Sequence, residues 1–542
     1  MTSQEELRLD DGDVQRGTAI LAITDLLTRS YREFGPRPAV VDSKGSLSYA
    51  DLAELAHRVA HGLIHLGCRP GDRIAIAAPN QVEWAVVEHA AYLSGLVRIG
   101  LLLRLHPQEI AQIATDAEPT VIVAEGKWLD EVGVDWIPGS VQVIVSIGPS
   151  AHATVTYEEL SARVAPEPLP GTHPDDDVVL YYTSGSTGVP KGVRHSGIGV
   201  GAMVHNLLTE LPDLGPEDAV LHSAPLSHFS GCVATAVLGA GGTNLLVGSF
   251  DMDQILSAIE QSQVSILVLV PTQLNMLTAE ILRRRGNGQA VHIDSLRAIV
   301  YSGSAIAPER AHDAQEVFGR ILIQFYGSSE APLPLTSLHP ADHRTDLIDS
   351  GGLPRLASAG RPTPNVELRI VGDDGREVPA DAPGDIQVRG RQTMRGYWRQ
   401  PEATDEVMDA AGWISTGDVG YLSQEGYLYI VDRKKDMIVT GGFNVYSREV
   451  ENAIARLPGV RQVAVVGAPS ERWGEEVTAF VILNPEALVT CNEIVDHCRV
   501  SIAGYKVPKQ VHLVETFPTT ATGKIKKQSL ADELWAGRDR RV

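Results

Sequence analysis

A loop rich in glycine and hydroxyl side chains is the strongest chemical signal in the sequence. It reads YTSGSTGVPKG over residues 182–192 and follows the apolar run VVLYY, so we expect it to leave the end of a strand. Gly185 and Gly188 allow a ligand to approach the backbone closely, and Lys191 adds a positive charge. Hydroxyl groups that can donate hydrogen bonds to phosphate oxygens come from Thr183, Ser184, Ser186 and Thr187. The loop therefore predicts a phosphate-binding site.

The pattern differs from the other common nucleotide-binding motifs. A Walker A loop requires GxxxxGK followed by serine or threonine, whereas here Pro190 precedes Lys191 and Gly192 follows it. The glycine clusters GAGGTN and GIGVG do not form a strand, a GxGxxG turn and a helix with an acidic residue about twenty positions further on. The sequence therefore argues against a P-loop kinase or GTPase and against an NAD-dependent oxidoreductase.

Composition narrows the class of protein further. The 542 residues include 46 Lys and Arg against 68 Asp and Glu, and the resulting net charge of −22 argues against nucleic-acid binding. The four cysteines are widely scattered, the N-terminus lacks the features of a secretory signal, and the longest apolar run, near residues 266–270, is far too short for a membrane span. We therefore expect a soluble cytoplasmic protein.

The pattern of helices and strands predicts an α/β fold with several units. Over residues 20–170 and 171–331, helical segments alternate with short β-branched runs, which is typical of parallel α/β subdomains. Over residues 332–432, Gly, Pro and Asp separate short alternating runs, which favours a β-barrel-like subdomain. We expect these three units to form a large N-terminal domain, 1–432, followed by a small α+β domain, 433–542.

Four further motifs follow the hydroxyl-rich loop along the chain. They read QFYGSSE at 324–330, GWISTGD at 412–418, DRKKDMIVTGGFNVYSREVE at 432–451 and TTATGKIKK at 519–527. Together the five motifs resemble those of the acyl-adenylate-forming superfamily, which includes acyl- and aryl-CoA ligases, and the resemblance extends from about residue 20 to residue 530. It implies that ATP, Mg²⁺, coenzyme A and a small carboxylic acid are the ligands.

The resemblance also assigns residues to the nucleotide. By resemblance, Tyr326 would lie by the adenine, Ser329 near the phosphates, and Glu330 would hold the Mg²⁺, as suits a hard oxygen ligand. Ser329 stands where threonine is usual, so the hydroxyl remains but its rotamer is less restricted. Asp418 and Arg433 would contact the ribose. The remaining nucleotide-binding residues are expected to be Gly327 and Ser304.

The last motif contains the residue expected to move during the reaction. By resemblance, Lys524 is the catalytic lysine of a mobile C-terminal domain, whose ammonium group would bridge the substrate carboxylate and the α-phosphate. The same resemblance places a hinge near Lys435 and assigns Gly441 and Gly442 to the passage for the thiol of coenzyme A. Two further lysines, Lys526 and Lys527, are expected to be solvated helix charges, and Thr519 stands where the family commonly has a basic residue.

The sequence says less about the identity of the carboxylic acid than about the nucleotide. By resemblance the acyl pocket is lined by residues 223–232, residues 301–307 and the strand before Tyr326. His228 stands near the substrate carboxylate, either as a binding residue or as a structural one. Adenylation domains for α-amino acids use an aspartate in the first segment, but residues 226–230 here contain no carboxylate. An aryl or medium-chain acid is therefore predicted.

Several alternatives remain open at this point. The acyl group could pass to coenzyme A or, in an amide synthetase or a related enzyme of secondary metabolism, to an amine or a carrier-protein thiol. The segment LLLRLHP at 101–107 stands where relatives often have a loop that contains proline and asparagine. This difference does not indicate which acceptor the protein uses. A regulator that has lost catalysis is disfavoured because such a protein would not need Lys524. A homodimer is compatible with the sequence.

Overall fold

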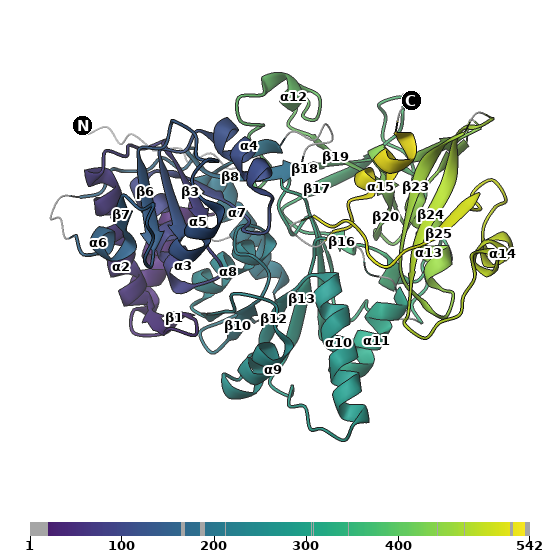
Figure 1. The fold of residues 1–542 in the computed structure, drawn as a ribbon, viewed down its shortest axis with the longest axis horizontal. Coiled ribbons are helices and arrows are strands. Elements are labelled where there is room, and N and C mark those ends of the chain that lie inside the picture. The colour runs from purple at the N-terminus through teal and green to yellow at the C-terminus, as the bar shows by residue number, and fades with distance from the viewer. Residues whose placement is uncertain are drawn as a thin grey trace, which may run out of the picture.

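The computed structural model describes residues 20–163, 168–184, 190–211, 213–304, 306, 308–344, 346–441, 443–470, 472–520 and 524–536. Within these residues the strands form four sheets. Three sheets belong to a large N-terminal body, and the fourth forms the core of a small C-terminal lid, which is the yellow-green unit in Figure 1. The predicted fold class, a mixed α/β fold with a large N-terminal and a small C-terminal domain, is confirmed.

A seven-stranded sheet lies in the N-terminal part of the body, in the order β7-β6-β5-β3-β4-β8-β9. All its neighbouring strands run parallel except the hairpin formed by the last two. Its strands are β3 (Arg73–Ala77), β4 (Val97–Gly100), β5 (Val121–Glu125), β6 (Val143–Ile147), β7 (Val155–Thr156), β8 (Asp177–Ser184) and β9 (Pro190–Ser196). Helices α2 (Tyr49–His65), α3 (Val82–Ser94), α4 (Pro107–Ala117), α5 (Gly126–Val132) and α6 (Tyr157–Ser161) belong to this part of the chain.

A nine-stranded sheet forms the second layer, in the order β16-β15-β14-β13-β12-β10-β11-β1-β2. Its strands are β1 (Pro38–Val41), β2 (Ser46–Ser48), β10 (Ala219–His222), β11 (Thr243–Leu246), β12 (Ile266–Leu269), β13 (Ala298–Tyr301), β14 (Leu322–Tyr326), β15 (Thr336–Leu338) and β16 (Arg361–Pro362). The other helices of the body before the third sheet are α1 (Ile23–Phe34), α7 (Gly197–Glu210), α8 (Phe229–Ala240), α9 (Met252–Gln261), α10 (Pro271–Gly286), α11 (Pro308–Phe318) and the 3₁₀ turn η1 (Arg355–Ala357).

The two large sheets exchange segments of the chain. Strands β1 and β2 join the second sheet although they precede residue 170, because Val40 and Val41 pair in parallel with Asn244 and Leu245. Strands β8 and β9 join the first sheet although they follow residue 171, because β8 pairs with β4. The expected division at residues 170 and 171 therefore does not coincide with the division into sheets.

The third sheet of the body is antiparallel and has four strands. They are β17 (Glu367–Val371), β18 (Gly384–Arg389), β19 (Ile414–Leu422) and β20 (Leu428–Arg433), with α12 (Pro401–Asp405) inserted before β19. One cluster of buried side chains, which includes Ile76, Val268 and Val388, joins all three sheets of the body. The body therefore has a continuous core.

The lid has its own sheet and core. Strands β21 (Ile438–Thr440), β22 (Phe443–Val445), β23 (Val460–Ser470), β24 (Gly474–Leu483) and β25 (Gln510–Leu513) follow the 3₁₀ turn η2 (Lys434–Asp436). Val450 of helix α13 (Ser447–Ala455) packs with Val465 and Val481 of the sheet. The remaining helices are α14 (Cys491–Ser501) and α15 (Lys527–Trp535). The limits of the three subdomains and a hinge near Lys435 stay predictions.

No helix in the described part of the chain is both long enough and apolar enough to cross a membrane. The four cysteines, Cys68, Cys232, Cys491 and Cys498, are free thiols. Cys498 is buried in the lid core beside Ile494. Among the described residues, no group of three or more His, Cys, Asp or Glu side chains is arranged to hold a metal ion.

Candidate active site

The hydroxyl-rich loop connects β8 to β9 at the carboxyl end of β8. The two strands form an antiparallel hairpin in which Thr183 is paired with Lys191 and Ser184 with Pro190. Thr183 and Lys191 are both half-buried, and they lie on opposite strands next to the two ends of the loop. The other predicted phosphate-binding residues, Gly185, Ser186, Thr187 and Gly188, lie outside the described residues, as does the side chain of Ser184.

Lys191 and Glu330 are connected through a tyrosine that the sequence did not single out. The ammonium group of Lys191 lies 4.9 Å from the ring centre of Tyr397, a cation–π contact. The hydroxyl of Tyr397 donates a hydrogen bond of 3.0 Å to Oε1 of Glu330. Burial, followed by the charge of Glu330, raises the pKa of Tyr397 well above its usual range, so the hydroxyl remains a donor. This arrangement orients the carboxylate predicted to hold Mg²⁺.

Tyr397 reaches this position because its segment pairs with β9. The backbone N–H of Arg194 donates to the carbonyl of Gly396 at 3.0 Å, and the N–H of Trp398 donates to that of Gly192 at 2.7 Å. Tyr397 itself forms a β-bridge with Val193. No motif in the sequence marks this pairing, since its two sides lie about two hundred residues apart.

The three residues predicted to contact adenine and ribose come together. The hydroxyl of Tyr326, at the end of β14, donates to Oδ2 of Asp418 at 2.7 Å. Nε of Arg433 lies 3.3 Å from Oδ1 of the same carboxylate, and the two residues are paired across β19 and β20. Burial is the largest influence and opposes the charge of Arg433, but Asp418 and the other acidic groups around it together outweigh burial and raise the pKa of the guanidinium. The carboxylate is buried, whereas the side chain of Arg433 is 52% exposed.

The loop after Tyr326 is closely packed. A Cβ atom added to Gly327 would lie 2.6 Å from the backbone nitrogen of Leu333, so only glycine fits without a shift. The backbone carbonyl of Ser329 accepts a hydrogen bond of 2.8 Å from Nε2 of His195, a second residue that the sequence did not single out. Burial lowers the pKa of His195 to about 4, so the ring is neutral at pH 7. The backbone N–H of Met394 donates to the carbonyl of Glu330 at 2.8 Å and fixes its backbone.

Lys524 reaches into the body from the lid. A Cβ atom built on Gly303 would lie 3.9 Å from Cε of Lys524, which places the lysine stem beside the second residue after β13. The main chain of the lysine is held by Thr520, whose Oγ1 accepts from the Lys524 N–H at 3.0 Å. Gly303 is adjacent to Ser302, whose hydroxyl donates to the carbonyl of Phe325 at 2.7 Å. The expected catalytic lysine is therefore close to the β13 and β14 ends that carry Ser304 and Tyr326.

His228 lies at the N-cap position of α8. Its Nδ1 is 2.8 Å from the hydroxyl of Ser227. Burial, and then the positive charges of Arg98 and Lys524, lower the pKa of His228 to about 4. A backbone hydrogen bond with Tyr182 of β8 acts in the opposite direction and raises the pKa of the ring, so His228 is held by both Ser227 and β8.

A buried ion pair supports the segment before His228. The guanidinium of Arg98 on β4 lies 2.6 Å from Glu88 on α3, with side-chain exposures of only 2% and 9%. Arg98 also donates to the carbonyl of Ser227 at 3.3 Å and stacks on the ring of Tyr181 at 5.2 Å. The sequence did not indicate this pair. The sequence feature that could have indicated it is Arg98, a charged residue within a strand that is otherwise apolar.

The lysines that follow Lys524 are not both solvated. Nζ of Lys526 lies 3.5 Å from Glu109 of α4, an exposed contact between lid and body. Nζ of Lys527 lies 2.6 Å from Oε1 of Glu451, with side-chain exposures of 20% and 16%. The expectation of a solvated helix charge was therefore wrong for Lys527, because helix α15 packs this residue against α13.

The segment predicted to guide the thiol lies on the lid. Gly441 has a φ of +57°, and a Cβ atom there would lie 2.8 Å from the ring of Trp473, so glycine is required on both grounds. Gly442 and the side chain of Lys435 lie outside what the structure describes. Trp473 is 42% exposed.

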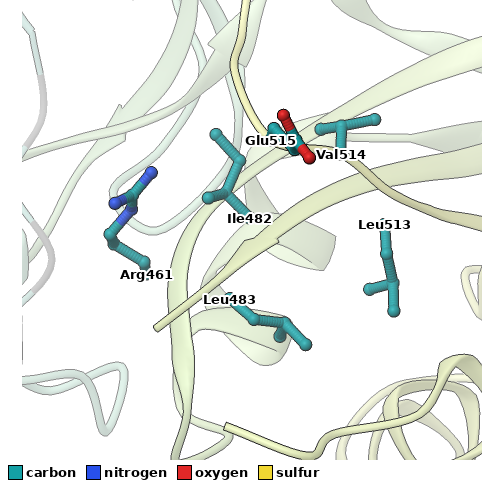
Figure 2. A pocket seen from close by; sticks show the side chains of 6 residues that line it. All are labelled: Arg461, Ile482, Leu483, Leu513, Val514 and Glu515. Atoms are coloured by element: carbon teal, nitrogen blue, oxygen red, sulfur yellow. The ribbon is translucent and has the colours of Figure 1, made fainter. Parts of the chain in front are cut away.

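A separate hollow of about 330 Å³ lies on the lid sheet. Figure 2 shows the six side chains around it, which are Arg461, Ile482, Leu483, Leu513, Val514 and Glu515. None of the predicted site residues lines it. The hollow is therefore distinct from the active site.

The family of the protein follows from comparison with known proteins. The chain matches the AMP-binding enzyme family over residues 27–398 and the AMP-binding enzyme C-terminal domain over residues 449–524. It therefore belongs to the AMP-binding enzymes, which agrees with the motifs and with the geometry around Asp418 and Lys524.

Individual relatives are similar over most of their length. An indoleacetate–CoA ligase from Aromatoleum aromaticum is 35% identical over 492 residues, covering 89% of this chain and 92% of the relative. A feruloyl-CoA synthase from Amycolatopsis is 34% identical, covering 89% and 93%. The structure of the amide bond synthetase McbA from Marinactinospora thermotolerans superposes with a TM-score of 0.84 at 31% identity, covering 94% of this chain and 99% of that protein.

Proposed function

We propose that the protein uses ATP to convert a carboxylic acid into an acyl-adenylate, with release of pyrophosphate, and then transfers the acyl group to the thiol of coenzyme A. The observation that carries this proposal is the position of Lys524, which reaches from the lid to Gly303 at the carboxyl end of β13. There it adds a mobile positive charge next to the strand end that carries Tyr326. A protein that only bound a nucleotide would have no use for a lysine on a separate domain.

The first half-reaction needs charge neutralisation more than covalent help. A carboxylate oxygen attacks the α-phosphorus of ATP, and pyrophosphate leaves in line with it, so negative charge accumulates around phosphorus. Lys524 would hydrogen-bond both the carboxylate and an α-phosphate oxygen, and Lys191 would neutralise charge at the phosphate loop. The adenosine would be held by Tyr326 at the base and by Asp418, which can accept both ribose hydroxyls.

The carboxylate of Glu330 suits a divalent cation. It is a hard oxygen ligand, and the hydrogen bond from Tyr397 engages Oε1 and sets the orientation of the group. When bound there, Mg²⁺ would neutralise charge on the phosphate oxygens. Glu330 therefore orients the phosphates in this proposal, while Lys524 acts at the reacting atoms.

We infer that the acid is an aryl or medium-chain carboxylic acid. Residues 226–230 offer no carboxylate to bind an α-ammonium group. The similarity to an indoleacetate–CoA ligase and a feruloyl-CoA synthase supports this acid class. We also propose a reducing, cytoplasmic environment, since the thiols are unpaired.

A second acceptor is supported by one comparison. The amide bond synthetase covers this chain as completely as the CoA ligases do, so an amine could replace the thiol in the second step. Offering coenzyme A, a phosphopantetheinyl carrier protein and a primary amine together, and identifying the product by mass spectrometry, separates the three acceptors. We expect the CoA thioester.

The adenylation step is tested by a pyrophosphate-release screen. Indole-3-acetate, ferulate, octanoate and tryptophan would each be supplied with ATP and Mg²⁺. We expect release with at least one of the first three and none with tryptophan. Turnover of tryptophan through its α-carboxylate would overturn the assignment of the acid class, and absence of release with every acid would overturn the proposed activity.

A further inference from the structure

Lys527 connects the catalytic segment of the lid to a second helix. It begins helix α15, three residues after Lys524. Its ammonium group is 2.6 Å from Oε1 of Glu451 and donates to the hydroxyl of Ser447 at 2.7 Å. Both partners lie on α13, so the ammonium group fixes the start of α15 against that helix.

The contacts continue into the body through Asp432. Ser447 donates its backbone N–H to Oδ2 of Asp432 and its hydroxyl to Oδ1 at 3.1 Å. Asp432 is the penultimate residue of β20 and is paired with Val419 of β19, so it belongs to the four-stranded sheet of the body. We call these four residues, Asp432, Ser447, Glu451 and Lys527, the Asp432–Lys527 junction. It joins the body sheet to the segment that carries the catalytic lysine.

The junction is enclosed, and Lys527 supplies the ammonium group that contacts Glu451 and Ser447. Asp432 is 5% exposed and Ser447 is fully buried. Burial raises the pKa values of Asp432 and Glu451. At each of these carboxyl groups, the charge of Lys527 is the largest influence that lowers the pKa. Removing the ammonium group would leave two enclosed carboxylates without that compensation, and such charges are strongly destabilising. The junction is formed in the same arrangement of lid and body in which Lys524 lies beside Gly303.

We propose that Lys527 is a positioning residue for adenylation, which keeps Lys524 over the site by joining α15, α13 and β20 through the Asp432–Lys527 junction. The proposal rests on the proposed function. Movement of the lid about residues 433–436 would separate Asp432 from Ser447, so the junction stabilises the adenylating arrangement and not a rotated one. Transfer of a preformed acyl-adenylate to coenzyme A should therefore be insensitive to it.

The other lysine in this segment does not explain the position of the lid. The contact between Lys526 and Glu109 is long, at 3.5 Å, and the two side chains are 38% and 40% exposed. Exposed ion pairs of this kind contribute little to stability. The enclosed junction is the stronger connection between lid and body in this region.

The test measures the two half-reactions separately in the full-length protein. Pyrophosphate release would be measured with indole-3-acetate, ferulate and octanoate, and thioester formation with the corresponding synthetic acyl-adenylates and coenzyme A. The variants are Lys527→Met, Lys527→Arg and the milder Ser447→Ala, which removes the hydroxyl between Asp432 and Lys527 but keeps the backbone N–H that donates to Asp432. Lys509→Met, an exposed lysine on the same lid, is the matched control.

We expect Lys527→Met to lower pyrophosphate release about tenfold or more, Ser447→Ala to lower it less, and Lys527→Arg to recover most of the rate. Thioester formation should change less than about twofold. Equal loss in both half-reactions, or an unchanged rate of pyrophosphate release in Lys527→Met, would overturn the proposal.

A structural readout separates this inference from the proposed function. Hydrogen exchange at the Ser447 amide should accelerate in Lys527→Met and not in Lys509→Met, because that amide donates to Asp432. If the wild-type protein released no pyrophosphate with any acid, the proposed function would fail. Slow exchange of the same amide in wild type and Lys527→Met alike would then overturn the junction itself.

Discussion

Tyr326 donates its hydroxyl hydrogen to Oδ2 of Asp418 at 2.7 Å, which ties the end of β14 to β19. Two motifs about ninety residues apart thus form one nucleoside-binding wall. The hydrogen bond engages one carboxylate oxygen before any nucleotide arrives, while Arg433 approaches the other. The orientation of the carboxylate is therefore set by the protein.

Removing this hydrogen bond should weaken ATP binding. Hydrogen bonds to a charged partner contribute about 1.5 to 3 kcal/mol, so Tyr326→Phe should raise the KM for ATP by about tenfold with a smaller change in kcat. Tyr421→Phe is the control, since it removes a hydroxyl from β19 at a ring that stacks on Tyr429. Steady-state kinetics with varied ATP would decide. An unchanged KM for ATP would mean that ATP binding does not depend on the orientation that Tyr326 gives to the carboxylate of Asp418.

Lys524 should be essential to the first half-reaction. Lys524→Ala removes the positive charge proposed to act on the α-phosphate, so pyrophosphate release should fall by roughly 10²-fold or more. Lys526→Ala, which removes only the exposed contact with Glu109, should stay within about twofold. Both rates are measured by acid-dependent pyrophosphate release. If Lys524→Ala retained the wild-type rate, its catalytic role would be refuted.

Glu330 should determine the requirement for Mg²⁺. Glu330→Gln keeps the hydrogen bond from Tyr397 possible but removes the charge, so the Mg²⁺ concentration for half-maximal activity should rise at least about tenfold. EDTA should abolish activity, and added Mg²⁺ should restore it. Glu309→Gln, a surface carboxylate paired with Arg456, is the control. The same Mg²⁺ requirement in Glu330→Gln and wild type would place the metal elsewhere.

Buried neutral histidines should make the protein sensitive to acid. Burial lowers the pKa of His222 from 6.5 to about 4, so below about pH 6.5 the unfolded chain binds a proton that the folded one does not. Folding stability should therefore fall as the pH decreases from about 6.5 to about 4, by up to about 1.4 kcal/mol per pH unit for this residue.

The contribution of His222 can be isolated with a neutral substitute. The free energies of unfolding in urea of wild type and His222→Gln would be compared at about pH 7 and about pH 4.5. The variant starts from a lower stability, because the contacts with Ser230 and Asn244 change, but it should lose less on acidification. A variant that lost as much as the wild type would show that His222 is already charged when folded.

Local patterns predicted the elements well. Runs such as VVLYYTS and the strand before Tyr326 became β8 and β14, since a short β-branched run between loops has few alternatives to a buried strand. Sheet membership was not predictable in the same way. Strands β1 and β2 cross to the second sheet because of pairing with β11, and this pairing is formed between segments about two hundred residues apart.

The sequence by itself determined which chemical groups the protein possesses and the order in which they occur, since each motif is a contiguous set of residues whose chemistry can be read directly. Only the tertiary structure decided which groups cooperate. Tyr397 meets Lys191, His195 supports Ser329, and Lys527 joins the body through Ser447 and Asp432. These contacts depend on strand pairing and helix packing between distant segments, and no local pattern of residues encodes that register.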